Sequence, residues 1–213
     1  MMRVGILGSG VVGQALGRGF ASRGYSVKVS SRTPDSKKLK EWVRKNGKNA
    51  STGTFAEAAA FGDLLVLAIS GTAAEEAMDL AGKNNFDGKV LIDVTNALDF
   101  RGVSVGLFVG TTDSLGERIQ RKLPKARVVK CFNTVGNTQM VDPKHRDAEM
   151  LICGNDEAAK NEVTRIVKEF GWKDVIEVGG IDGARWLEAL VPLWVRVGTK
   201  LNKWDHVFKV LYD

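Results

Sequence analysis

Short apolar runs alternate with longer amphipathic stretches along this chain. Almost every position within the runs is apolar, which is typical of strands covered by helices on both faces. The alternation of strand and helix is that of βαβ units and predicts a mostly parallel sheet. The predicted strands are Arg3–Leu7, Ser26–Ser30, Asp63–Ala68, Lys89–Asp93, Arg127–Cys131, Glu149–Cys153 and Val175–Val178.

The ends of several predicted helices carry capping signals. Thr33 before Pro34 predicts a helix start, and Gly47 predicts the end of that helix. Thr54 is expected to cap a helix over Phe55–Phe61. Asp156 is expected to begin a helix that runs to Phe170, before Gly171.

The C-terminal segment has a different pattern. From Gly183 onward the predicted helix is apolar around much of its circumference, with Trp186 and Trp194 among its residues. A helix of this kind must bury more than one face. It could pack against the edge of the sheet or across a two-fold axis, and we favour a homodimer. We expect residues 1–180 to form the nucleotide-binding domain and residues 181–213 a helical extension that borders the substrate cleft and the dimer contact.

A glycine motif follows the first strand directly. The residues Gly8, Ser9, Gly10, Val11, Val12 and Gly13 form a G-x-G-x-x-G string that opens an amphipathic helix. In this context the first glycine permits a tight turn, the second lets the backbone approach a pyrophosphate, and the third allows close packing of helix on strand. The helix N-terminus then offers free N–H groups to the phosphates. The motif predicts a dinucleotide-binding, doubly wound Rossmann sheet with a short C-terminal helical segment.

The end of the second strand indicates which dinucleotide binds. NAD-specific domains place an acidic residue there to hold the ribose 2′-hydroxyl. This chain has Ser31 and Arg32 instead, which suit a 2′-phosphate through a hydrogen bond and a charge-assisted contact. Lys37 or Lys38 could add charge one turn later. Asp35 is the alternative NAD contact, but it follows Pro34 and is better explained as a residue of the first helical turn. We therefore expect NADP(H).

No residue is an obvious general acid beside the nicotinamide. Carbonyl reduction usually uses a positioned His, Lys or Tyr. His145 lies in a polar loop and His206 near the C-terminus, so both are interpreted as surface residues. Tyr25 and Tyr212 suggest no Tyr/Lys pair, and Arg185 stands where β-hydroxyacid dehydrogenases would have a lysine. We predict no catalytic side chain and an acceptor that takes hydride without a protein proton.

Composition excludes several other classes. The 213 residues are 44% hydrophobic and 26% charged, as in a globular protein, and no apolar run is long enough to span a bilayer. The N-terminus is unlike a secretion signal, and two apolar-flanked cysteines, Cys131 and Cys153, suit a reducing cytoplasm and no metal motif. The net charge of +6 comes with no nucleic-acid-binding motif. One basic cluster is a solvated helix face or could attract anionic small molecules. It comprises Lys37, Lys38, Lys40, Arg44, Lys45 and Lys48. A second cluster is interpreted as a solvated helix face and comprises Arg118, Arg121, Lys122 and Lys125.

Several segments together resemble a known family over essentially the whole chain. They are Gly5–Gly13, Ser31-Arg32, Asp93–Phe100, Thr112–Glu117, Arg127–Thr134, Met140–Pro143, Cys153–Asp156 and Leu190–Trp194. In this order and spacing they resemble the NADP-dependent coenzyme F420 oxidoreductases. They are also similar to the reductase domain of the STEAP metalloreductases.

The resemblance implies a function and a set of sites. It implies hydride transfer between NADP(H) and the deazaflavin coenzyme F420, a small-molecule acceptor. It implies that Ser9 to Val12 hold the pyrophosphate, and that Ser31 and Arg32 hold the 2′-phosphate. Archaeal members can carry a histidine where Asn133 stands, so the deazaflavin contact there is expected to differ. The residues expected around the ribose, nicotinamide and deazaflavin are Ile69, Ser70, Asn96, Asn133, Thr134, Val135 and Asn137.

Two alternatives to this function stay open. The acceptor could be a flavin, an imine or a metal chelate. The chain could also be a non-catalytic module that senses NADP(H), which would need the phosphate loop but no acceptor pocket.

Overall fold

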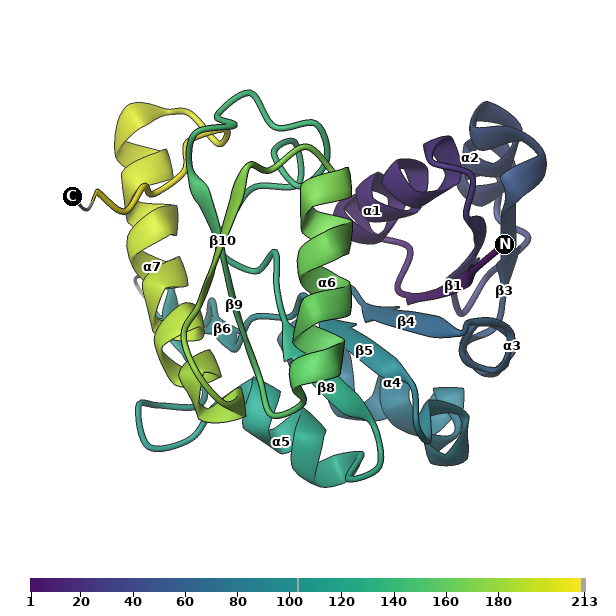
Figure 1. The fold of residues 1–213 in the computed structure, drawn as a ribbon, viewed down its shortest axis with the longest axis horizontal. Helices are drawn as coiled ribbons and strands as arrows, with labels where there is room; N and C mark the ends of the chain where they lie inside the picture. The colour runs from purple at the N-terminus through teal and green to yellow at the C-terminus, as the bar shows by residue number, and fades with distance from the viewer. Residues whose placement is uncertain (103, 212–213) are drawn as a thin grey trace.

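The computed structural model describes residues 1–102 and 104–211 as a doubly wound α/β fold (Figure 1). Its central sheet has eight strands in the order β10-β9-β8-β5-β4-β1-β2-β3. Neighbouring strands are parallel except β8 and β9, which are antiparallel. The strands are β1 Arg3–Leu7, β2 Ser26–Ser30, β3 Ala50–Gly53, β4 Leu64–Leu67, β5 Val90–Asp93, β8 Arg127–Lys130, β9 Glu149–Gly154 and β10 Asp174–Glu177. The predicted fold class, a mostly parallel Rossmann sheet with a C-terminal helix, is confirmed.

Helices cover both faces of this sheet. Side chains of α1, α2 and α6 form one buried cluster with the strands, and side chains of α3, α4 and α5 form a second cluster on the opposite face. The layers are visible in Figure 1, with α1 and α2 above the sheet and α3 and α4 below it. The helices are α1 Val11–Ser22, α2 Lys37–Asn46, α3 Phe55–Phe61, α4 Ala74–Ala81, α5 Leu115–Lys122, α6 Glu157–Glu169 and α7 Ala184–Leu201.

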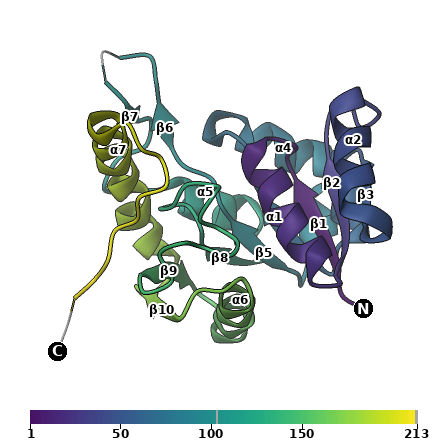
Figure 2. The same cartoon turned by 90° about the horizontal axis from the view of Figure 1, so that it is seen from above.

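The predicted strands agree with the observed ones to within one residue at each end. Two features were not predicted. The edge strand β3 has the sequence Ala-Ser-Thr-Gly, which lacks an apolar run. A small hairpin, β6 Leu98–Asp99 with β7 Gly106–Leu107, follows β5. From above, this hairpin lies beside α7, and α1 lies across the molecule from both (Figure 2).

Capping chemistry sets most helix ends as predicted. The Thr54 hydroxyl accepts from the Glu57 N–H while the Glu57 carboxylate accepts from the Thr54 N–H, a complete capping box for α3. The Asp156 carboxylate caps α6 through the Ala159 N–H.

The predicted start of α2 is wrong. The Ser36 N–H bonds to the Thr33 carbonyl, so residues 33–36 form a turn and α2 begins at Lys37 with Ser36 as its N-cap. Asp35 therefore lies in this turn and not in the first turn of a helix.

The topology positions a site at the carboxyl edge of the sheet. From β1 the chain builds outward to β2 and β3 on one side, and β4 continues toward β5 and β8 on the other. Ligands of doubly wound sheets bind at this switch point, outside the carboxyl ends of the strands. Within the described ranges, no helix has both the length and the apolar character that a bilayer crossing needs.

Candidate functional site

The glycine loop after β1 has a geometry that fits the three roles expected of its glycines. Gly8 has a φ of 126°, and a Cβ there would overlap the Ala68 carbonyl oxygen, so only glycine fits. A Cβ on Gly13 would overlap the Gly8 carbonyl oxygen, so the helix can approach the strand only through glycine. A Cβ on Gly10 would meet no atom within 4 Å. The space beside Gly10 is therefore open, as an approaching pyrophosphate requires.

A cleft of about 770 Å³ opens at this loop, along the carboxyl ends of β1, β2, β4 and β5. Ten of the sixteen residues expected from the sequence line it. They are Gly8, Ser9, Gly10, Val11, Val12, Ser31, Arg32, Ile69, Ser70 and Asn96. Seven lining residues were not expected, namely Thr33, Phe55, Ala68, Gly71, Val94, Leu98 and Phe100.

One end of the cleft lies at the end of β2. Ser31 and the exposed Arg32 line it, and the Ser31 hydroxyl accepts a hydrogen bond from the Thr33 N–H at 3.1 Å. The buried Ser30 hydroxyl accepts from the Gly8 N–H at 3.1 Å, which ties this strand end to the glycine loop. Among the described lining residues, Arg32 is the one ionisable side chain. Lys37 is exposed and lies outside the lining.

Asn96 marks the other end of the cleft and is fixed by a neighbouring loop. Its amide donates to the Asn133 carbonyl at 3.1 Å, and the Asn133 amide donates back to the Asn96 side-chain oxygen at 3.0 Å and to the Leu187 carbonyl at 3.0 Å. Asn133, Thr134 and Val135 are buried behind the cleft lining. The Asn133 side-chain oxygen is buried and has no partner among the described residues. Asn137 lines a separate groove between α1 and α2.

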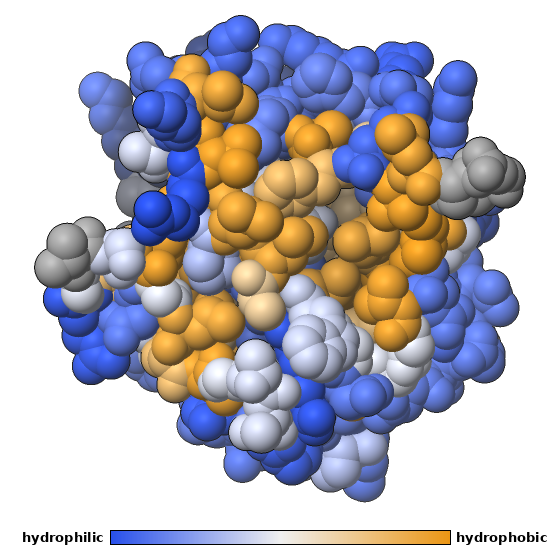
Figure 3. Space-filling model, turned by 90° about the vertical axis from the view of Figure 1, so that its left-hand side faces the viewer, coloured by the Kyte–Doolittle hydropathy of each residue, from blue (hydrophilic) through white to orange (hydrophobic). Residues whose placement is uncertain are grey.

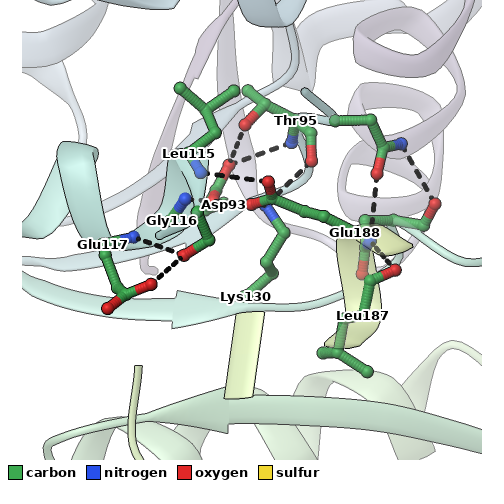
Figure 4. A network of polar contacts seen from close by, with 11 residues as sticks. Asp93, Thr95, Leu115, Gly116, Glu117, Lys130, Leu187 and Glu188 are labelled. Carbon is green, nitrogen blue, oxygen red and sulfur yellow. Dashed lines mark hydrogen bonds and ion pairs between the residues drawn. The ribbon is translucent and has the colours of Figure 1, made fainter. Parts of the chain in front are cut away.

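A buried charged cluster braces this end of the site (Figure 4). The Lys130 ammonium, at the end of β8, lies 2.7 Å from the Asp93 carboxylate and 2.9 Å from the Glu188 carboxylate. It also donates to the Thr95 carbonyl at 2.8 Å. The Glu188 carboxylate accepts from the N–H groups of Leu115 and Gly116, at the start of α5. The cluster thus joins α7 and α5 to the ends of β5 and β8. Asn96 follows β5 three residues later.

The charge state of Lys130 follows from its surroundings. Burial disfavours the ammonium, but the two carboxylates outweigh this effect and hold the pKa of Lys130 above its ordinary value. This cluster was not predicted from the sequence. A signal was available, because Asp93 and Lys130 each end an apolar strand with a charge and are directly paired in the sheet register.

Other candidate residues lie outside the cleft lining. His145 is exposed as predicted, whereas His206 is half-buried and stacked on Trp194, with ring centroids 4.6 Å apart. Arg185 makes a bidentate pair with Glu117 and lowers the pKa of that carboxyl. Both cysteines are buried free thiols, and burial raises the pKa of Cys153 to about 12. Tyr212 lies outside the described residues.

The fold, the glycine loop and the cleft together define a dinucleotide-binding domain of the Rossmann class. Residues 3–97 match the family described as NADP oxidoreductase, coenzyme F420-dependent. A crystal structure from Arthrobacter sp. FB24, assigned to the F420-dependent NADP-reductases, is 36% identical, and the match covers 100% of both chains with a TM-score of 0.95. This chain belongs to the coenzyme F420-dependent NADP oxidoreductase family.

Curated relatives that are 27% identical to this chain include two with different coverage. The rat metalloreductase STEAP3 matches over 90% of this chain, which spans only 38% of the length of that protein. The F420-dependent NADP reductase of Methanocaldococcus jannaschii matches over 55% of this chain and 54% of its own length. The resemblance found in the sequence is therefore confirmed at the level of the family.

Proposed function

We propose that this protein transfers hydride reversibly between NADP(H) and a deazaflavin such as coenzyme F420. The main support for this proposal is the chemistry of the cleft lining. Among the described residues that line the cleft, Arg32 at the end of β2 is the one with an ionisable side chain. This lining offers a partner for a 2′-phosphate and no His, Lys or Tyr that would protonate a developing alkoxide. A deazaflavin ring delocalises the added charge itself and has no need of such an acid.

The residues present fit a bound NADP(H). The open space at Gly10 admits a pyrophosphate, and the start of α1 offers N–H groups to it. Ser31 and Arg32 would hold the 2′-phosphate, with Lys37 adding charge nearby. Ile69, Ser70 and Asn96 would border the ribose and nicotinamide. When bound, the nicotinamide supplies the hydride, and the protein acts by holding donor and acceptor in contact.

The acceptor would stack beside the loop that follows β8. Asn133, Thr134 and Val135 would act from behind the lining, with Asn133 orienting Asn96 through their reciprocal amide contacts. The unpartnered side-chain oxygen of Asn133 supports a polar role at this place. Asn137 would contact the acceptor farther along, where it lines the groove between α1 and α2.

We also infer a cytoplasmic homodimer whose contact includes the extension 181–213, of which the last two residues lie outside the described ranges. Leu187 and Val191 of α7 are buried, but Trp186 and Leu193 on the same helix are 64% and 52% exposed. Figure 3 shows apolar side chains gathered over this side of the molecule. Covering them with a second copy would bury the remaining face of α7. Sedimentation should give twice the chain mass, and a Leu193→Glu variant should give a monomer.

The test of the function is a panel of acceptors. Purified protein is mixed with NADPH and, separately, with coenzyme F420, a flavin, a cyclic imine and a ferric chelate, and the loss of NADPH absorbance is followed. The proposal expects F420 to be reduced fastest. Faster reduction of another acceptor would replace the deazaflavin in this proposal, and NADPH binding without turnover of any acceptor would favour a sensing module.

A further inference from the structure

A second groove adjoins the cofactor cleft. It has a volume of about 440 Å³, lies between α1 and α2, and shares Val11 with the cleft. Its lining has three basic residues, Arg18, Lys38 and Lys45, and one acidic residue, Glu41. Asn137 is contributed by the loop after β8. It is therefore a basic groove that adjoins the cofactor cleft at the start of α1.

The groove is firmly connected to the phosphate loop. The side-chain amide of Gln14, which lines the groove, donates to the Ser9 carbonyl of the loop at 2.7 Å. The Trp42 indole N–H donates to the Gln14 backbone carbonyl at 3.2 Å and so attaches α2 to α1. Lys38 and Lys45 are seven positions apart on α2, a spacing that places both on one face of the helix. The groove is thus built on two helices and not on a mobile loop.

The charges of this groove are largely uncompensated. Within the described ranges, neither Arg18 nor Lys38 has an acidic partner within 4.0 Å, and only Lys45 is paired, with Glu41 at 2.8 Å.

The other basic cluster of the chain, on and after α5, is different. Arg118 and Arg121 pair with Asp113, and Lys122 pairs with Asp79. Lys125 likewise pairs with Asp87. Each of these α5-side cations therefore has a carboxylate partner, whereas Arg18 and Lys38 of the α1–α2 groove have none, and an anionic ligand group would be favoured there.

We propose that this groove is the subsite for the anionic tail of the hydride acceptor. The inference rests on the proposed function, because that function supplies an acceptor with a ring and an acidic, phosphate-bearing tail. The ring would lie over the nicotinamide in the cleft. The tail would pass Val11 and lie along α1 and α2, where Arg18 and Lys38 would neutralise its phosphate and carboxylates and Asn137 would donate a hydrogen bond.

The experiment compares two acceptors, coenzyme F420 and the same deazaflavin without its tail. In a double variant, Arg18→Gln with Lys38→Gln, the KM for F420 should rise at least about tenfold, which corresponds to about 1.4 kcal/mol and to the loss of one charge-assisted hydrogen bond. The KM for the tailless acceptor, the KM for NADPH and kcat should stay within about twofold. The wild-type KM for F420 should also rise with salt more steeply than that of the double variant.

A matched double variant controls for net charge. Lys40→Gln with Arg44→Gln likewise removes two exposed positive charges, here both from α2, and neither residue lines the groove. This control should leave the KM for F420 within about twofold.

Three results would overturn the subsite. The first is an equal rise in the KM for F420 in the two double variants. The second is an equal rise in the KM for both acceptors in the Arg18/Lys38 double variant. The third is a rise in that variant confined to the KM for NADPH. If the wild type reduces both acceptors with the same KM, the subsite is refuted while the proposed function stands. If it reduces neither, both are refuted.

Discussion

Replacing Lys130 by methionine removes the ammonium from a buried cluster that contains two carboxylates. The Lys130 side chain is fully buried, and its Nζ lies 2.7 Å from Asp93 and 2.9 Å from Glu188. Removing one partner of a buried ion pair costs about 3–5 kcal/mol, because an uncompensated charge remains in the interior. In a domain of this size each kcal/mol lowers Tm by about 2–4 °C, so a drop of about 6–20 °C is expected.

The assay is unfolding in urea and by heat, followed by circular dichroism. Lys125→Met is the matched control, because the Lys125 side chain is 74% exposed and solvent screens its pair with Asp87, so the loss of this pair should change stability little. Adding Glu188→Gln to Lys130→Met should recover part of the loss by removing one unpaired carboxylate. If Lys130→Met unfolds no more easily than the Lys125 control, the cluster does not brace the site as described.

Three further predictions address the cofactor site and the pH dependence of stability. Arg32→Ala should weaken NADPH binding by about 1.5–3 kcal/mol and leave NADH binding nearly unchanged in titrations of both cofactors, and equal losses would contradict a 2′-phosphate contact. Gly10→Ala should keep the wild-type melting temperature, since its Cβ meets no atom within 4 Å, yet abolish NADPH binding. Unchanged NADPH affinity would show that the glycine only forms a turn. Hydrogen bonds from the Arg3 side chain and backbone lower the pKa of Asp63 from 3.8 to about 2. Because the folded pKa lies below the unfolded one, this stabilisation is present above about pH 4 and is lost toward pH 2. Asp63→Asn should therefore flatten the fall in the free energy of unfolding at acid pH. If that fall is unchanged, the Arg3–Asp63 pair is not its cause.

The sheet could be predicted from the sequence because buried parallel strands are nearly continuous apolar runs. β1 and β2 were predicted with their observed bounds. The edge strand β3 was missed because an edge strand of Ala, Ser, Thr and Gly has no such run. The start of α2 was misplaced because Thr33 and Pro34 favour a turn as readily as a helix start, and only the tertiary structure decides between them.

The site was predicted where a motif or a strand end carries it. Gly8 to Val12, Ser31 and Arg32 follow directly from their positions after β1 and β2, and all line the cleft. Phe55, Leu98 and Phe100 come from a helix start and a small hairpin that carry no motif, so their approach to the cleft depends on packing. The reciprocal contact between Asn96 and Asn133 likewise joins residues 37 positions apart.

The most direct measurement of the central claim follows the hydride itself. NADPH carrying deuterium at one or the other face of the nicotinamide C4 is incubated with the protein and oxidised coenzyme F420. The proposed mechanism predicts that one of the two labelled forms, and only one, delivers its deuterium to C5 of the reduced deazaflavin. The product should then be one mass unit heavier than the reduced F420 formed from unlabelled NADPH. Loss of the label to water, or NADPH oxidation with F420 left oxidised, would contradict direct transfer between the two rings.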